Sequence, residues 1–355
     1  MKKLSEDQLK DKHSETSEIL RQRIHDRDIA LAAYRREHGI LEEFFRQVRD
    51  ACTPIKPEKK LYEFRKSKLE IPCSVVAHST DGHHGANQIS SEVEGFGTFS
   101  PAISERRQLG FMNEFIKWVD LHRHAYTINE MTHIVTGDMI SGDIHDELRI
   151  TNEWPSPVQA VEAGKLLARQ VAIAAPHFDK VTVEFITADN HSRLTKKPQA
   201  KEAGMNTFNY VVGEVAKAYL RDHNNVVFNL YPLHETVIHV STRQYLICHG
   251  HDVMGWAGLP WYGIERKVGR ESVARLQIIM QDNQKAKSIG FHRYVFGHWH
   301  TPIDLPLYLG TGSVSGTDAF DHQQGRHSEP SQSGWLVHPR YGEFDIIRFK
   351  LKEFD

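Results

Sequence analysis

Five short polar segments follow one another along the chain, and they consist mostly of Asp, Asn, His and Gly. They are Asp81-Gly82-His83, Gly137-Asp138, Asn190-His191, His249-Gly250 and Gly297-His298-Trp299-His300. Carboxylate, amide and imidazole groups together suit divalent metal ions such as Mn²⁺, Fe and Zn²⁺. Two such ions held side by side can activate water against a phosphate ester. The segments therefore predict a dinuclear metal site with hydrolytic chemistry.

The spacing of residues within two of these segments suggests that their side chains can act together at a metal site. Asp81 and His83 are separated by one glycine, so both side chains can reach the same ion. Side chains alternate along extended backbone, which would put His298 and His300 on one side and Trp299 on the other. Each segment alone is a weak signal, because polar residues are common in loops. Five of them in order are a much stronger one.

The elements that must position these segments are short strands alternating with helices. Runs rich in β-branched residues predict strands at residues 74–77, 133–136, 181–187, 226–230, 245–248 and 294–296. Helices are expected near residues 111–124, 157–175, 207–221 and 271–289, the second with Ser156 as its N-cap. Every polar segment follows a predicted strand, and ligands of open α/β sheets gather beyond the carboxyl ends of strands. We therefore expect the five segments to converge.

The two ends of the chain differ from this central pattern. Apolar residues alternate between residues 307 and 351, which predicts strands of a second sheet. Residues 1–70 are predicted to be a helical N-terminal extension and residues 71–355 the main α/β domain. One helix of the extension carries an apolar stripe, formed by Leu41, Phe44, Phe45, Val48 and Cys52. The stripe is expected either to pack on the main domain or to contact a second copy or a partner protein.

Composition narrows the class of protein. Hydrophobic residues make up 39% and charged residues 25% of the 355 residues, as in ordinary soluble globular proteins. The net charge of −2 gives no global attraction to nucleic acid. The three cysteines are far apart in the sequence and are expected to be reduced. There is no long apolar run and the first residues are charged, so we expect no membrane partner and a cytoplasmic location.

The ordered segments resemble the motifs of the calcineurin-like metallophosphoesterases, which run Asp-x-His, Gly-Asp, Gly-Asn-His, His and Gly-His-x-His. The resemblance covers residues 74–315. It implies a four-layer α/β/β/α sandwich with a dinuclear site at the sheet edge. It also implies the ligands: one ion would be held by Asp81, His83, Asp138 and His300, and the other by Asp138, Asn190, His249 and His298. Asp138 would bridge the two ions.

The chain departs from this pattern beside Asn190. Asp189 precedes it where the family usually has glycine, which is expected to stiffen the turn or alter its angle. Ser192 follows His191 where many members have an acidic residue. That change removes a carboxylate that could orient His191.

The resemblance implies a mechanism. Two divalent ions, with Mn²⁺ the first choice and Fe, Zn²⁺ or Mg²⁺ also compatible, would share a hydroxide that attacks the phosphorus in line. His191 would donate a proton to the leaving oxygen, because the family places this histidine over the scissile phosphate and imidazole titrates near neutral pH.

Two further histidines lie beside the motif residues. His251 is two residues past His249 and is expected on the same face, where it would support the ligands or contact substrate. His84 follows His83 directly and is expected to point elsewhere.

A basic stretch after His191 bears on the substrate. Arg193, Lys196, Lys197 and Lys201 are either a solvated face or a grip on the phosphates that flank a cleaved bond. The second reading, with a resemblance to phage and bacterial members suspected to be nucleases, favours a phosphodiesterase acting on DNA. The alternatives are hydrolysis of monoesters or of small, including cyclic, nucleotides, and an inactive binding or scaffold protein with the same fold.

Overall fold

The computed structural model describes residues 21–29, 32, 39, 41–60, 71–255 and 260–355. It divides into two units, Met1–Cys52 and Thr53–Asp355, which are considered separately. In the first unit, residues 21–29 and 41–51 are helical, as expected for an N-terminal helical segment. Phe45 of the apolar stripe is buried, whereas Leu41 and Phe44 are exposed. The partner of this stripe stays a prediction.

The second unit contains a six-stranded sheet with the order β11-β10-β1-β2-β3-β4. Its strands are β1 (Ser74–Ser79), β2 (Glu130–Val135), β3 (Lys180–Ile186), β4 (Val226–Tyr231), β10 (Ser331–His338) and β11 (Gly342–Lys350). Strands β1 to β4 are parallel, and β10 pairs antiparallel with β1. Helices connect the parallel strands, so the carboxyl ends of β1, β2 and β3 meet at one edge.

A five-stranded sheet has the order β5-β6-β7-β9-β8. Its strands are β5 (Glu235–Val240), β6 (Arg243–Cys248), β7 (Arg293–Phe296), β8 (Ile303–Leu305) and β9 (Tyr308–Gly310). Strands β6, β7 and β9 are parallel to one another. The carboxyl ends of β6 and β7 therefore also lie together.

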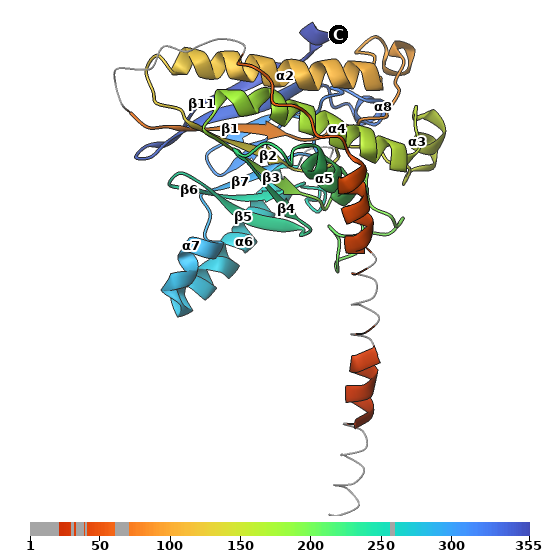
Figure 1. Ribbon diagram of the computed structural model, residues 1–355, viewed down its shortest axis with the longest axis vertical. Coiled ribbons are helices and arrows are strands. Elements are labelled where there is room, and N and C mark those ends of the chain that lie inside the picture. Colours follow the sequence, from red (N-terminus) through yellow and green to blue (C-terminus); the bar gives the residue numbers. More distant parts are fainter. Residues whose placement is uncertain (1–20, 30–31, 33–38, 40, 61–70, 256–259) are drawn as a thin grey trace, which may run out of the picture. The chain divides into compact units, whose positions relative to one another are not determined.

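Helices cover the outer faces of both sheets (Figure 1). The described α-helices of this unit are α2 (Pro101–His122), α3 (Asp146–Thr151), α4 (Ser156–Ala174), α5 (Phe208–Tyr219), α6 (Trp261–Gln281), α7 (Ala286–Ile289) and α8 (Ala319–Gln323), with short 3₁₀ turns η1 (Ser90–Val93), η2 (Ala175–His177), η3 (Asn283–Lys285) and η4 (Lys352–Phe354). They complete a helix, sheet, sheet, helix sandwich, which confirms the predicted fold class.

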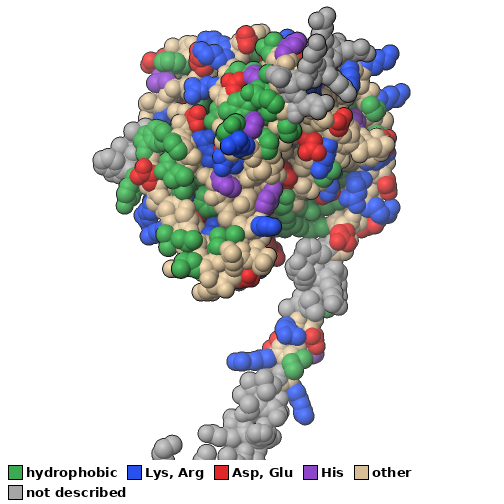
Figure 2. All heavy atoms as spheres, turned by 90° about the vertical axis from the view of Figure 1, so that its left-hand side faces the viewer, with side chains coloured by type: hydrophobic (Ala, Val, Ile, Leu, Met, Phe, Trp, Pro, Cys, Tyr) green, Lys and Arg blue, Asp and Glu red, His purple; other side chains and the backbone are tan. Residues whose placement is uncertain are grey.

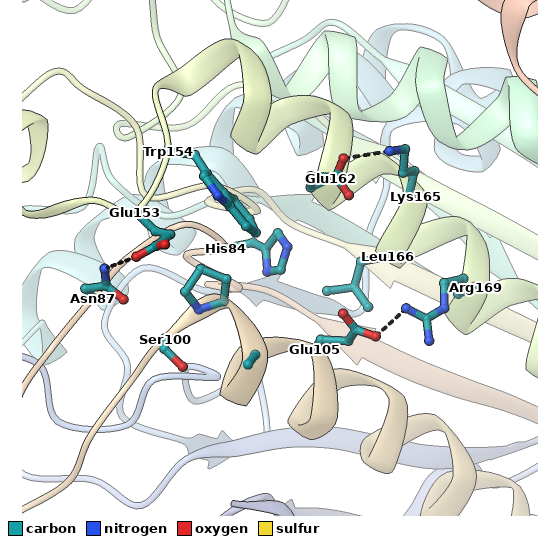
Figure 3. A pocket seen from close by; sticks show the side chains of 12 residues that line it. His84, Asn87, Ser100, Glu105, Glu153, Trp154, Glu162, Lys165, Leu166 and Arg169 are labelled. Atoms are coloured by element: carbon teal, nitrogen blue, oxygen red, sulfur yellow. Dashed lines mark hydrogen bonds and ion pairs between the residues drawn. The ribbon is translucent and has the colours of Figure 1, made fainter.

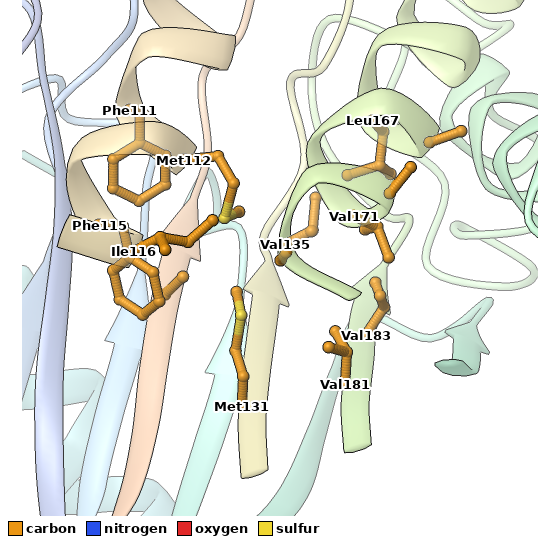
Figure 4. Packing of buried hydrophobic residues seen from close by; sticks show 14 of the residues in the cluster. Phe111, Met112, Phe115, Ile116, Met131, Val135, Leu167, Val171, Val181 and Val183 are labelled. Atoms are coloured by element: carbon orange, nitrogen blue, oxygen red, sulfur yellow. The ribbon is translucent and has the colours of Figure 1, made fainter. Parts of the chain in front are cut away.

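Three apolar clusters hold the layers together. Helices α2, α4 and α5 pack on the six-stranded sheet through residues such as Phe115, Val135 and Val171 (Figure 4). Alternate residues of the same strands, such as Val76 and Ile134, face the second sheet. The third cluster joins the second sheet to α6, where Ile264 and Val268 are buried. Both faces of the parallel strands are thus covered, and most of the residues of β1, β2 and β3 are buried.

All six predicted strands are present, but the C-terminal prediction is only partly right. Strands β8 and β9 belong to the second sheet, whereas β10 and β11 extend the first. The reason is that Trp335 and Val337 of β10 do face the second sheet, across the inter-sheet cluster. Alternation in sequence reports which face of a strand is buried and not which sheet the strand joins. Strand β5 was not predicted.

Helix α4 also begins differently from the expectation. Ser156 is its first helical residue, and Pro155 is the N-cap without a side-chain hydrogen bond. The carboxylate of Asp143 accepts the Ser156 backbone N–H at 2.9 Å. A carboxylate from a preceding loop therefore does what a serine cap was expected to do.

Burial along α2 predicts that two of its residues contribute differently to the free energy of unfolding. Replacing Phe115, which is fully buried, with Ala should cost about 3–5 kcal/mol, because the ring leaves a cavity between helix and sheet. Leu121 lies on the same helix with 70% of its surface exposed, and its replacement with Ala should change stability by less than about 0.5 kcal/mol. Urea unfolding followed by tryptophan fluorescence would measure both. Equal losses would contradict the packing described here.

Candidate metal centre

The five polar segments meet where strands of the two sheets end. Asp81, Asp138 and Asn190 follow β1, β2 and β3 of the first sheet, and His249 and His298 follow β6 and β7 of the second. Backbone hydrogen bonds join neighbouring segments. The Asp81 N–H donates to the Gly137 carbonyl at 3.2 Å, and the Gly297 N–H donates to the His249 carbonyl at 2.9 Å. The predicted convergence is confirmed.

Unusual backbone conformations turn these side chains toward one another. Asp81, His83, Asp138, His298 and His300 all have positive φ, between 39° and 67°. Non-glycine residues seldom adopt this left-handed region, although Asp and His do so more readily than most. Such conformations cluster at functional sites. Among the described residues, five of the nine non-glycine residues with positive φ are predicted ligands.

A first cluster consists of Asp81, His83 and His300, whose candidate ligand atoms lie within 4.8 Å of one another. All three residues are buried. The two Nε2 atoms of His83 and His300 are 3.1 Å apart, and Asp81 Oδ1 is 3.5 Å from His300 Nε2. The three donor atoms therefore face a common point.

A second cluster consists of Asp138, His249 and His298. Asp138 Oδ2 is 2.9 Å from His249 Nε2, and the amide oxygen of Asn190 is also 2.9 Å from that nitrogen. Asp138 further belongs to a group with His83 and His191. It is thus the residue that links the two clusters.

The donor atoms fit two divalent ions. Atoms that bind an ion at about 2.1 Å and at right angles to each other lie about 3 Å apart. The spacings in both clusters, 3.1 Å between His83 and His300 and 2.9 Å between Asp138 and His249, match this value. The set contains oxygen and imidazole donors and no thiolate, which suits Mn²⁺, Fe or Zn²⁺.

Burial and charge set the protonation of the histidines. Burial lowers the pKa of His83 to about 3 and holds that of His298 well below its usual range, so both keep a free lone pair at neutral pH. Burial also disfavours charge on His249, but the Asp138 carboxylate outweighs it and raises the pKa to about 10. Because metal ions bind neutral imidazole, an ion at His249 must displace a proton.

His191 is oriented by the backbone instead of by an acidic side chain. Its Nδ1 lies 2.7 Å from the Ser141 carbonyl oxygen, and its own backbone N–H donates to Asp138 Oδ1 at 3.1 Å. Its ring centroid is 4.7 Å from that of His83. The carbonyl thus takes the orienting role that the missing acid could have had, and it leaves Nε2 available.

The two departures beside Asn190 compensate for each other. Asp189 is buried, and its Oδ1 accepts hydrogen bonds from the backbone and the hydroxyl of Ser192, at 2.9 and 2.6 Å. Its Oδ2 accepts the Asp138 N–H at 2.7 Å and the side-chain amide of Asn209. These hydrogen bonds stiffen the turn, which was one of the two expected effects of Asp189. They also connect the turn to Asp138, the residue predicted to bridge the two ions.

Sequence reasoning missed Asp321. This residue of α8 is buried, and its carboxylate lies 2.5 Å from His300 Nδ1. It follows the last motif across two short strands, and no spacing or periodicity marks it. Only the folded chain brings it to the first cluster.

The predicted substrate residues are not all alike. Arg193 donates to the carbonyl groups of Thr195 and Lys196, so it folds its own loop. Lys196 pairs with Asp146 at 2.9 Å, and Lys197 is exposed. His251 lies on the same face as His249, with ring centroids 5.6 Å apart, and its Nδ1 has no hydrogen-bond partner among the described residues. Whether these side chains contact a substrate stays a prediction.

His84 points away from the clusters, as expected. It lines a cavity of ≈ 520 Å³ between α2 and α4 (Figure 3). There its ring meets Trp154 edge-on, with centroids 5.5 Å apart, and its Nδ1 is 3.2 Å from the Ser104 hydroxyl. Ion pairs between Glu105 and Arg169 and between Glu162 and Lys165 border this cavity.

Two further findings concern the cysteines and the helices. Cys52, Cys73 and Cys248 are free thiols. Within the described residues, no helix combines the length and the apolar character needed to cross a membrane.

Ion stoichiometry should separate the ligands by cluster. After dialysis against a fixed Mn²⁺ concentration, the wild-type chain should retain two ions, His298→Ala one, and Asp138→Asn neither, because only Asp138 contributes to both clusters. His124→Ala, at an exposed position after α2, is the control and should retain two. Elemental analysis provides the count. Loss of a single ion from both Asp138→Asn and His298→Ala would show that Asp138 is not shared.

Comparisons with known proteins add the following. No family model matches the sequence, and no curated protein matches it closely enough to count as a relative. The fold is similar to Vacuolar Protein Sorting 29 from Cryptosporidium parvum, with 13% identity over 78% of this chain and 98% of the other and a TM-score of 0.31. It is also similar to a dimetal phosphatase from Danio rerio, with 8% identity over 79% of this chain and 100% of the other and a TM-score of 0.36.

A third similar structure is a putative 5'-nucleotidase from Staphylococcus aureus, with 10% identity over 79% of this chain and 54% of the other and a TM-score of 0.32. The four layers of this chain and the strand-end positions of its five segments agree with the expectations drawn from its sequence.

Proposed function

We propose that this chain is a dinuclear metal-dependent phosphoesterase. The observation that carries the proposal is the pair of buried clusters linked by Asp138, each with imidazole and carboxylate donors at metal-ligand spacing. The Asp138 carboxylate raises the pKa of His249 to about 10, so an ion in the second cluster would take the place of a proton. A donor set of carboxylates and imidazoles without thiolate suits two divalent ions.

The residues of the chain have distinct roles in the proposed reaction. Bound ions would supply a nucleophile at neutral pH and charge stabilisation for the phosphoryl group, with Mn²⁺ as our first choice. His191 is held by Ser141 through Nδ1, which leaves Nε2 to donate a proton to the leaving oxygen. A ligand atom of His191 lies within 4.8 Å of those of His83 and Asp138, which is close enough to act on a group bound between the clusters.

The proposed substrate is a phosphodiester, with DNA as the first candidate. The support is the basic loop, because Lys197 and Lys201 are exposed in the same segment as His191. Flanking phosphates exist in a polynucleotide and not in a simple monoester. On the face drawn in Figure 2, Lys and Arg side chains are interspersed with Asp and Glu. The net charge of −2 gives no global attraction to a polyanion either, so the proposal relies on the local basic loop.

Small phosphate esters, including cyclic nucleotides, are the second candidate. The observation that favours them is that two of the basic side chains already have partners. Arg193 is bonded to its own loop and Lys196 to Asp146. A site that recognises only the phosphoryl group would need no further cations.

A substrate panel distinguishes these functions. Wild-type protein with added Mn²⁺ would be assayed on single-stranded, double-stranded and circular DNA, on a bis-nitrophenyl diester and on a nitrophenyl monoester. Cleavage of DNA supports the nuclease. Rapid turnover of the monoester alone would rule out the nuclease. No hydrolysis with any divalent ion would rule out both enzymes and favour an inactive binding or scaffold protein.

Removal of His191 should affect substrates according to their leaving groups. His191→Ala should slow cleavage of a deoxyribose leaving group by about 10²–10⁴, because an alkoxide needs a proton. The bis-nitrophenyl diester should slow much less, since nitrophenolate leaves without one. The comparison of kcat on both substrates serves as its own control. Equal losses, or loss of bound ions, would assign His191 to the ligand set instead.

Removal of two lysines should test polynucleotide binding. Lys196→Ala with Lys197→Ala should weaken DNA binding and reduce the slope of log K against log salt by about 1 to 2, as expected for one or two lost phosphate contacts. Lys285→Ala with Lys287→Ala changes the charge equally at another exposed place, η3 and α7, and is the control. An unchanged slope in the first variant would show that these lysines are solvated surface residues that do not contact DNA phosphates.

A further inference from the structure

Helix α8 brings a carboxylate to the rear of one ligand histidine. Asp321 is 1% exposed, and its Oδ2 lies 2.5 Å from His300 Nδ1. Its other oxygen forms an ion pair with Arg326 at 2.7 Å. Its backbone N–H is capped by Asp318 Oδ1 at 2.7 Å. One oxygen of the carboxylate therefore faces His300, and the other is paired with Arg326.

We propose that Asp321 is a positioning residue that orients His300 and tunes it as a metal ligand. The inference rests on the proposed function, since it assumes that the first cluster binds an ion. Imidazole offers two nitrogens, and a hydrogen bond at one decides which is left for a ligand. With Nδ1 beside Asp321, Nε2 is the nitrogen that faces His83 and Asp81, at 3.1 and 3.5 Å.

The surroundings of Asp321 suit this role. Arg326 lies over the rings of Trp299 and Phe320, at 5.6 and 5.3 Å from their centroids, and so cannot leave the carboxylate easily. The hydroxyl of Ser328 donates to the His300 carbonyl at 2.7 Å, which holds the backbone of the same histidine. Helix α8 thus contacts the imidazole ring of His300, and the loop after it holds the backbone carbonyl of the same residue.

Asp321 also distinguishes the two clusters. The Nδ1 atom of His249 meets the Thr136 carbonyl, a neutral partner, at 2.7 Å. Among the ligand histidines with a described Nδ1 partner, His300 is the one whose partner is a carboxylate outside the ligand set. An anionic outer partner makes an imidazole a stronger donor. The first cluster should therefore hold its ion more tightly than a neutral partner would allow.

The test is direct titration of metal binding, without any substrate. Mn²⁺ affinity of both sites would be measured calorimetrically for the wild type and for Asp321→Asn. We expect one of the two affinities to fall about 10- to 100-fold in the variant and the other to stay the same. Asp345→Asn is the matched control, because Asp345 pairs with His122 away from the site and should leave both affinities unchanged.

A double-mutant cycle separates positioning from a general structural role. In a His300→Ala background, Asp321→Asn should cause no further loss of affinity, because its effect passes through that ring. Additive losses would overturn the proposal, as would wild-type affinity in Asp321→Asn alone. If Asp321→Asn does not fold, Asp321→Asn with Arg326→Gln removes the charge pair together and is measured instead, with the same expected loss. Failure of the wild type to bind two ions would contradict the proposed function itself.

Discussion

One buried carboxylate ties the two sheets together at the place where the candidate site forms. Asp81 follows β1 of the first sheet, and both of its oxygens accept the backbone N–H of His298 after β7 of the second, at 3.1 and 2.9 Å. The close approach requires glycine at position 297, since a Cβ there would lie 2.5 Å from Asp81 Oδ2. This contact places His298 of the second cluster beside Asp81 of the first.

The same contact explains how the chain tolerates strain. Residues in the left-handed region cost about 1–3 kcal/mol each, and they persist only where their surroundings fix them. Here the surroundings are hydrogen bonds between strand ends and the apolar clusters on both sides of each sheet. Asp189 contributes in the same way when it accepts the Asp138 N–H and holds the turn before His191. The scaffold thus places the donor atoms of both clusters close together.

Sequence and structure agree where the signal is local. The strands and their polar ends follow from periodicity and spacing, which depend only on neighbouring residues. The placement of His298 and His300 in different clusters does not follow from strand alternation, because both residues have left-handed backbone conformations. The sheet joined by β10 depends on pairing with β1 across the whole chain, and sequence alternation does not encode it. Asp321 could not be predicted for the same reason, because only the folded position of α8 brings it into contact with His300. Asp189 was noticed as a departure, but its bond to Ser192 needed coordinates to be seen.

The choice between DNA and small esters depends on how firmly the basic loop is already engaged. The pair between Lys196 and Asp146 is highly exposed, with 72% and 79% of the two side chains in solvent. Such pairs contribute little, are screened by salt and exchange readily for another anion. A phosphate could therefore replace Asp146 without loss of structure. The Arg193 guanidinium is different, because its bonds to two backbone carbonyls shape the loop itself, so Lys196 and Lys197 are the side chains left to recognise a polymer.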